Sequence, residues 1–252
     1  MKVINISMPN HNLFAFDLIS DLYLEQWPSI DWSTEPTSLI AVVAGDLSSD
    51  LDHTVHELKK ISKHYRQVLY IDGDLEHQDQ LSEVDGNRAY LAKKLNNTKN
   101  ITYMHEHVLI INHVAFIAAN LWWSPGESTT SINDDGWMEE MQMLTLHHED
   151  LNYMRYTVQR IQDCKDIQKC VIVSHTVPNR ELILGPAHQN LFSDASDWVE
   201  IEDHMHKIST WCFGHWNRSV KTTVNDCQYV SNPKGKPSDS LGLQYHPMRV
   251  LV

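Results

Sequence analysis

The amino-acid sequence predicts an α/β layered domain, and two observations support this prediction. Short apolar runs rich in β-branched residues recur along the chain, and each run ends in small or acidic residues. Such runs are buried strands more often than helices. Between them lie stretches with apolar residues at 3–4 spacing, which is the period of an amphipathic helix. Alternation of strands and helices along a chain is typical of a layered α/β domain.

The expected elements can be placed by residue. Strands are expected over Leu13–Ser20, Leu39–Ala44, Val68–Ile71, Val108–Ala118 (two strands around a turn at Asn112 and His113), Cys170–Ser174, Trp211–Phe213 and Gln228–Val230. Helices are expected over His53–Arg66, Asn87–Leu95 and Glu149–Cys164. The segment Met1–Asn12 is consistent with an edge strand or a mobile end, and the polar segment Gly126–Gly136 with a surface loop or lid.

The composition fits a single globular domain over residues 1–252. A chain of this length is within the range of one large domain. Its 33 acidic residues against 20 basic ones give a formal net charge of -13. This balance argues against a protein that binds nucleic acid over a broad basic surface. A nucleotide or a short phosphodiester remains open as a ligand, because a bound divalent cation supplies local positive charge.

The cysteines and the apolar runs predict a cytoplasmic protein. Cys164, Cys170, Cys212 and Cys227 include no Cys-x-x-Cys pair, so reduced thiols are expected instead of a zinc knuckle or a redox motif. No apolar run approaches the ~18 residues that span a bilayer, and the N-terminus lacks a signal-peptide pattern. We therefore expect no membrane partner.

Acidic residues and histidines follow the ends of five predicted strands. They are Asp21, Asp46, Asp74, His175 and His215. In open α/β sheets ligands bind outside the carboxyl ends of the strands, so these side chains are expected to converge. Carboxylates with imidazoles suit Mn, Fe or Zn, and the lack of a cysteine disfavours a structural zinc site. Each residue alone has an ordinary interpretation as a turn or helix-cap residue.

These segments resemble the motifs of calcineurin-like metallophosphoesterases. That family carries D-x-H, G-D, G-N-H-[DE], a lone His and G-H-x-H, each after a strand. The corresponding stretches here are ISDLYLE (Ile19–Glu25), AGDLSSD (Ala44–Asp50), DGDLEH (Asp72–His77), VSHTVP (Val173–Pro178) and FGHWN (Phe213–Asn217). AANLWWS from Ala118 and SNPKG from Ser231 resemble segments of phage and bacterial members, so a bacterial or phage-infected host cell is expected. The resemblance runs from about Leu13 to Gly235 and implies a four-layer α/β/β/α sandwich with two mixed sheets.

The resemblance assigns metal-binding roles by position. Asp46 matches the aspartate that bridges two metals. Asp21 matches the aspartate of the first metal, but Tyr23 and Asn217 stand where that metal has histidines. At the second metal Asp74 replaces an asparagine, and the family's two histidines correspond to His175 and His215.

The two implied sites differ in strength. The second keeps Asp46 and Asp74 with His175 and His215, so it is expected to bind Mn²⁺, with Fe, Zn or Mg as alternatives. The first keeps carboxylates but has lost both imidazoles, and a neutral tyrosine is a poor ligand. We expect it to bind Mg²⁺ or Mn²⁺ weakly or to bind no metal.

The proton donor of the family is also missing. Leu75 occupies the position of the histidine that protonates the leaving group, and leucine cannot supply a proton. His77 is a candidate replacement, with a surface histidine as the ordinary interpretation. Arg218 is a candidate phosphate contact, with a solvated arginine as its ordinary interpretation. The candidate catalytic residues are therefore Asp46, Asp74, His175 and His77.

Two functions follow from this pattern. The first is a metal-dependent phosphoesterase, expected to be a phosphodiesterase that uses a metal-activated hydroxide on a phosphoester or nucleotide. The second is an impaired pseudo-phosphoesterase that serves as a binding or regulatory protein, favoured by Tyr23, Leu75 and Asn217 and by the tryptophan-rich segment Leu121–Trp123. The Asn-to-Asp exchange at Asp74 strengthens a metal site, which favours the enzyme. The sequence leaves the natural substrate and the oligomeric state open.

Overall fold

The computed structural model describes most of the chain, and the fold below refers to that part. The described residues are 2–9, 14–27, 36–78, 83–122, 134–178, 182, 206–239 and 245–252. Residues 126–133 of the predicted loop and Trp123 of the tryptophan-rich segment lie outside these ranges.

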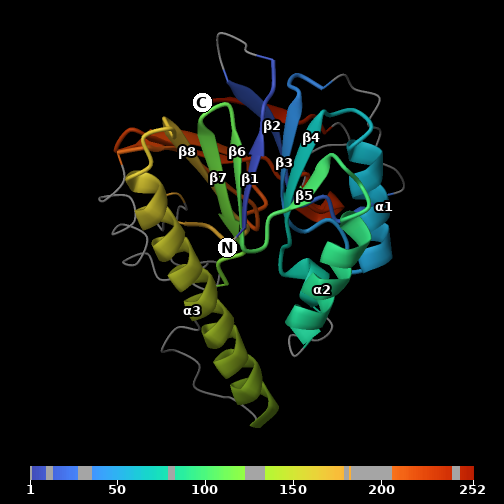
Figure 1. Cartoon of the computed structure of the whole chain (residues 1–252). Helices are drawn as coiled ribbons and strands as arrows, with labels where there is room; N and C mark the ends of the chain where they lie inside the picture. Colours follow the sequence, from blue (N-terminus) through green and yellow to red (C-terminus); the bar gives the residue numbers. More distant parts are fainter. Residues whose placement is uncertain are drawn as a thin grey trace.

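The strands form two mixed sheets (Figure 1). The seven-stranded sheet has the order β1 (Lys2–Ile6), β6 (His107–Ile111), β7 (Val114–Ala119), β8 (Lys169–Ser174), β9 (Ile208–Phe213), β11 (Cys227–Ser231) and β10 (Val220–Val224). The five-stranded sheet has the order β12 (Met248–Leu251), β2 (Ala15–Ile19), β3 (Ile40–Ala44), β4 (Gln67–Ile71) and β5 (Ile101–Tyr103). From β2 to β5 and from β7 through β9 to β11 neighbouring strands are parallel, so their carboxyl ends share an edge.

Helices cover the outer faces of both sheets, and the sheets pack against each other. An apolar core between the sheets includes Phe16 and Phe116, whose rings meet edge to face with centroids 5.6 Å apart. Helices α1 (Leu51–Ile61) and α2 (Val84–Leu95) pack on the five-stranded sheet, and α3 (Asp134–Gln162) packs on the seven-stranded one (Figure 1). The predicted four-layer α/β/β/α sandwich is confirmed. Its extent as one domain over residues 1–252 stays a prediction.

Local sequence explains how α1 is delimited. The Asp50 carboxylate caps its N-terminus by accepting hydrogen bonds from the backbone N–H groups of Asp52 and His53, at 2.8 and 3.2 Å. Lys59 and Lys60 lie in its last turn, where positive charge is favourable to the helix dipole.

All predicted strands are found, together with four others, β1, β5, β10 and β12. For the N-terminal segment the sequence left an edge strand and a mobile end as alternatives, and the structure has an edge strand there, β1. Strands β5, β10 and β12 were missed. β5 has three residues, β10 is a mainly exposed polar edge strand, and β12 buries only Val250, so none forms an apolar run. The turn at Asn112 and His113 is confirmed, and both residues have the positive φ (46° and 69°) of a tight hairpin turn.

The helix predictions hold, with one correction. α3 begins at Asp134, far before the predicted Glu149, so residues 134–136 of the expected loop are helical. The expectation of a loop rested on the polar character of the segment, which does not exclude a helix. Figure 1 shows the N-terminal part of α3 extending past the sheets.

Two further properties concern the whole described chain. All four cysteines are free, as predicted. Among the described residues, none of the helices is long and apolar enough to cross a membrane.

Candidate metal centre

Four of the five strand-end residues predicted to converge form one cluster where the carboxyl ends of strands from both sheets meet, and Asp21 lies beside it. Asp46 and Asp74 follow β3 and β4 of the five-stranded sheet, whereas His175 and His215 follow β8 and β9 of the seven-stranded sheet. Ligand atoms from these four residues all lie within 4.8 Å of one another. The site is therefore built equally from both sheets.

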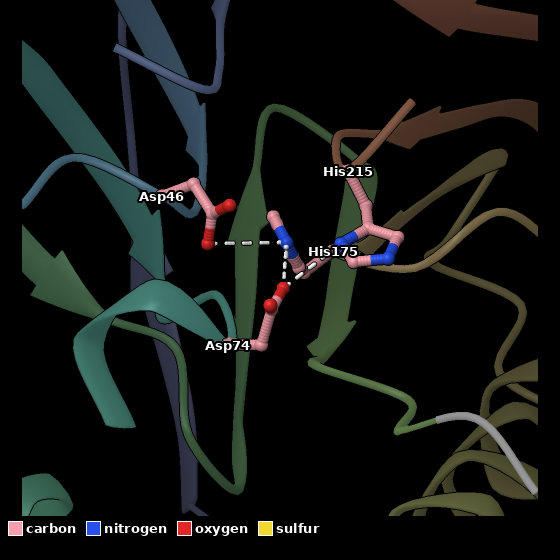
Figure 2. Close-up of side chains that lie close together, drawn as sticks. All are labelled: Asp46, Asp74, His175 and His215. Atoms are coloured by element: carbon pink, nitrogen blue, oxygen red, sulfur yellow. Dashed lines mark hydrogen bonds and ion pairs between the residues drawn. The ribbon is translucent and has the colours of Figure 1, made fainter. Parts of the chain in front are cut away.

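Short contacts link the four side chains (Figure 2). His175 Nε2 lies 2.8 Å from Asp74 Oδ1 and 3.2 Å from Asp46 Oδ1. His215 Nδ1 lies 2.9 Å from the same oxygen of Asp74. Two carboxylates and two imidazoles around one point form a donor set that suits Mn, Fe or Zn.

The orientation of His175 fits metal binding. Its side chain is fully buried, and its Nδ1 lies 2.9 Å from the backbone carbonyl oxygen of Ala44. A hydrogen bond from Nδ1–H to this carbonyl fixes the ring with Nε2 facing the carboxylates, so that Nε2 would offer its lone pair to a cation once its proton is displaced. Histidines that bind metals usually have such a partner on the other ring nitrogen.

Without a cation, protons neutralise the cluster. Burial acts to lower the pKa of His175, but Asp46 and Asp74 raise it more, so that the pKa lies well above 6.5. The pKa of His215 is also raised, because Asp74 outweighs burial. Burial acts to raise the pKa of Asp74, but His215 and His175 hold it well below its usual range. The metal-free site thus consists of imidazolium–carboxylate pairs, and a cation must displace those protons.

The backbone at this edge is held in unusual conformations. Asp21, Tyr23, Asp46 and His215 all have positive φ, between 45° and 62°. This left-handed region is unfavourable for residues with a Cβ, and such strain concentrates at functional sites.

Gly73 is required by close approach. A Cβ at this position would lie 2.1 Å from Asp46 Oδ1 and 2.9 Å from His175 Cε1. The family-like Gly-Asp pair at residues 73 and 74 therefore leaves room for the Asp46 carboxylate.

Glu76 holds the site loops together and was not predicted as a functional residue. Its buried carboxylate accepts hydrogen bonds from the backbone N–H groups of Asp46 (3.1 Å), Leu47 (2.8 Å) and Gly73 (2.8 Å). These bonds tie the loop after β3 to the loop after β4. Burial and Asp46 raise its pKa to about 8, against the effect of the N–H donors. The acidic fourth position of the G-N-H-[DE] motif was the available sequence signal.

The residues of the first site lie beside the cluster. Asp21 Oδ1 accepts a hydrogen bond from the backbone N–H of His215 at 2.7 Å. Burial is the largest cause that raises the pKa of Asp21 to about 7, with Asp46 adding to it against His175. The Tyr23 hydroxyl donates to Asp46 Oδ2 at 3.1 Å, and burial with Asp46 raises the pKa of this phenol, so it stays protonated.

Two oxygens of the first site lack partners. Asp21 Oδ2 and Asn217 Oδ1 are buried without a hydrogen-bond partner among the described residues. Buried orphaned oxygens are costly in the absence of a partner, so they fit a position for a hard cation. That this site binds a cation more weakly than the four-residue cluster stays a prediction.

His77 does not lie among the four clustered side chains. Its side chain is buried, so the surface interpretation is wrong. Its Nε2 lies 2.8 Å from Asp72 Oδ2, its Nδ1 lies 3.3 Å from the Asn87 amide nitrogen, and its ring packs on Trp122. These contacts occupy both ring nitrogens and involve none of the four clustered side chains. The sequence gave no sign of the partner Asp72, and a catalytic role for His77 stays a prediction.

The structure also places Leu75, Arg218 and Trp122, three residues considered in the sequence. Leu75 donates its backbone N–H to Asp46 Oδ1 at 2.9 Å, so this position is at the site, as expected. Arg218 is exposed and its guanidinium stacks on Trp216 at 5.5 Å from the ring centroid. Trp122 is fully buried, so it packs in the core and cannot belong to a binding surface.

Comparison with solved structures agrees with this architecture. Over 94% of this chain and 95% of the other, the fold matches the phosphopantetheinyl hydrolase from Mycobacterium tuberculosis at a TM-score of 0.68 and 14% identity. It matches a dimetal phosphatase from Danio rerio over 88% and 87% of the two chains at a TM-score of 0.53 and 12% identity. The chain therefore has the calcineurin-like metallophosphoesterase fold. Comparison of its sequence with protein-family models and curated proteins finds no match.

Proposed function

We propose that the protein is a metal-dependent phosphoric ester hydrolase that acts on phosphodiesters. The observation that carries this proposal is the convergence of ligand atoms from Asp46, Asp74, His175 and His215 within 4.8 Å. The strained backbone at Asp46 and His215 supports it, because the fold maintains this geometry at an energetic cost. The hydrolase and phosphatase among the structural neighbours add support from the fold.

The four clustered residues would hold the principal cation, with Mn²⁺ as the first candidate. A divalent cation in such a site supplies Lewis-acid polarisation of a phosphoryl oxygen and lowers the pKa of a water molecule. The chain orients the ligands: the Ala44 carbonyl fixes the His175 ring, and Asp21 holds the backbone N–H of His215. The protonated Tyr23 hydroxyl directs its hydrogen bond to Asp46 Oδ2.

The substrate class follows from the missing proton donor. Leu75 stands at the site edge where the family has an imidazole, and both nitrogens of His77 are occupied elsewhere. Without general-acid help, hydrolysis is limited by how well the leaving group carries negative charge. Esters with acidic leaving groups, such as activated phosphodiesters, are therefore the proposed substrates.

The test is hydrolysis of bis-p-nitrophenyl phosphate by metal-stripped protein while Mn²⁺ is titrated. Saturable, Mn²⁺-dependent turnover is expected in wild type. It should disappear in Asp46→Asn, which keeps the size of the side chain, and persist in Asp163→Asn at an exposed site. Parallel titrations with Fe²⁺, Zn²⁺ and Mg²⁺ identify the preferred cation.

The pseudo-phosphoesterase is the competing function, and the same assay separates it. Absence of turnover with every cation, in protein that is folded and binds Mn²⁺, would reject hydrolysis in favour of a binding protein. Equal activity in wild type and Asp46→Asn would instead show a contaminating enzyme and would equally reject the proposed site.

A further inference from the structure

We propose that Lys236 supplies a second positive charge to the site and contacts a non-bridging oxygen of the phosphoester. This inference rests on the proposed function. In this proposal the Lys236 ammonium neutralises negative charge at the first site. In the calcineurin-like family that the sequence resembles, a metal with two histidine ligands would provide this positive charge. Tyr23 and Asn217 stand in place of those histidines.

Backbone contacts hold the segment around Lys236 beside the site. After β11 the chain runs along the end of β2, where Ser20 pairs with Pro233. The backbone N–H of Lys234 donates to the Ser20 carbonyl at 3.0 Å, and that of Gly235 donates to the Asp21 carbonyl at 2.9 Å. The residue immediately before Lys236 is thus hydrogen-bonded to Asp21 itself.

The side chain of Lys236 contacts the ring of Tyr23, whose hydroxyl is hydrogen-bonded to the cluster. Its Nζ is 4.9 Å from the centroid of the Tyr23 ring. The hydroxyl of that same ring donates to Asp46 Oδ2 at 3.1 Å. Lys236 is half-buried as a residue.

The charge balance of the site calls for an additional cation. When the carboxylates of Asp21, Asp46 and Asp74 are all ionised, one divalent cation leaves them with one uncompensated negative charge. The approaching phosphodiester is itself an anion, and repulsion between like charges at close range is large where water is partly excluded. One ammonium near Asp46 offsets this charge and offers three hydrogen-bond donors to a phosphoryl oxygen.

Two neighbouring basic residues are directed elsewhere. Lys234 is buried, with its Nζ 3.7 Å above the ring of Trp27. The guanidinium of Arg218 lies on Trp216. Only Lys236, among these three, contacts a ring that is hydrogen-bonded to a clustered carboxylate.

The experiment measures phosphate binding separately from hydrolysis. Mn²⁺-loaded wild type, Lys236→Ala, Lys236→Arg and the control Lys99→Ala, an exposed lysine outside the site, are titrated with inorganic phosphate by calorimetry. Metal content is determined for each protein. Lys236→Ala is expected to keep its Mn²⁺ and to bind phosphate about 10-fold to about 100-fold more weakly, as for loss of a charged hydrogen bond. Lys236→Arg should recover most of the affinity, and KM should rise more than kcat falls in Lys236→Ala.

Three outcomes would overturn the inference. They are wild-type phosphate affinity in Lys236→Ala, loss of Mn²⁺ from this variant, and absence of phosphate binding in wild type. If wild type hydrolyses no ester but binds phosphate through Lys236, the proposed function fails while the inference stands. If Asp46-dependent hydrolysis is present but Lys236→Ala matches Lys99→Ala, only the inference fails.

Discussion

At the scale of single residues, the position of Leu75 sets the chemical limits of the site. Its backbone N–H is bonded to Asp46, so a side chain at this position stands next to the clustered carboxylates. An imidazole here could protonate a departing alkoxide, whereas an isobutyl group only excludes water. In the proposed hydrolase the leaving group would then depart without a proton, so Leu75 would restrict the range of substrates.

Replacing Leu75 with histidine is expected to broaden that range. General-acid catalysis contributes roughly 10²–10⁴-fold, so Leu75→His should raise kcat on alkyl phosphodiesters by up to that factor. Bis-p-nitrophenyl phosphate, whose leaving group needs little protonation, should change much less. Kinetics on a leaving-group series measure the effect. Leu75→Phe serves as the control, and an equal response of the His and Phe variants would contradict the argument.

Glu76 is expected to act on metal affinity without touching the metal. In Glu76→Gln an amide NH2 group replaces one of the two carboxyl oxygens that accept backbone N–H groups, so at least one of these hydrogen bonds is lost and the loop that carries Asp46 is loosened. Residues that support metal ligands typically change metal affinity by about 10- to 100-fold. Calorimetric Mn²⁺ titration should show such a loss. Glu57→Gln alters a buried glutamate of α1 that is paired with Lys60, and should keep wild-type affinity.

The convergence of Asp46, Asp74, His175 and His215 was predictable because each stands at a fixed point of the chain, just past an apolar strand. The contacts of Glu76 were not predicted, because the motif marks an acidic residue at this position but does not show that its carboxylate binds the backbone N–H groups of two loops. His77 was misread for a related reason. Its partner Asp72 lies five residues earlier, and nothing in the spacing shows that both are buried.

At the scale of elements, a buried ionic network fastens α2 to the end of β4. Asp72, at the end of β4, receives Arg88 Nε at 3.2 Å and the Tyr103 hydroxyl at 2.6 Å, in addition to His77. Burial acts to raise the pKa of Asp72, but Arg88 and His77 hold it well below its usual range, so it is ionised. The loop with Asp74 begins directly after this anchor.

Removing the cation of this network should be costly. Arg88→Met leaves Asp72 and Asp150 buried with less compensation, and breaking a buried pair costs about 3–5 kcal/mol of unfolding free energy. Urea unfolding measures it. Lys94→Met removes an exposed pair with Asp52 and should change stability little. Similar midpoints for the two variants would show that the network contributes no more than a surface pair.

Elements with a continuous apolar run were predicted well, and edge elements were not. Strand β3 is buried and apolar throughout, and β8 is buried and apolar over Cys170–Val173, as expected for strands covered on both faces. Strand β10 pairs only with β11 and exposes most of its residues. Its strand conformation is set by pairing, which a local sequence pattern does not encode.

At the scale of the whole molecule, pH and metal are expected to act together on stability. In metal-free protein the histidines have raised pKa values, so their contribution is complete below about pH 6.5 and is lost as the pH rises through their folded-state values. Asp21, with a pKa of about 7, adds a destabilising charge over the same rise. Raising the pH from about 6 to about 8 should therefore lower the unfolding free energy in EDTA.

Saturating Mn²⁺ should reverse this dependence, because the cation replaces protons that are lost more easily at higher pH. The urea midpoint with Mn²⁺ should stay level or increase over the same range, and calorimetry in buffers of different ionisation enthalpy should count the released protons. A midpoint that falls equally with and without Mn²⁺ would contradict proton displacement.

The ligands come from four loops that are widely separated along the chain, and this has a consequence during translation. Asp46 and Asp74 belong to the sheet whose first strands are synthesised early, but His175 and His215 leave the ribosome much later. An emerging polypeptide that ends before residue 175 can form much of its first sheet yet offers only carboxylates, and the four-residue cluster is complete only once His215 has been added. Loading of the proposed cation would thus be a late event of biosynthesis, because the full ligand set exists only in a nearly finished chain.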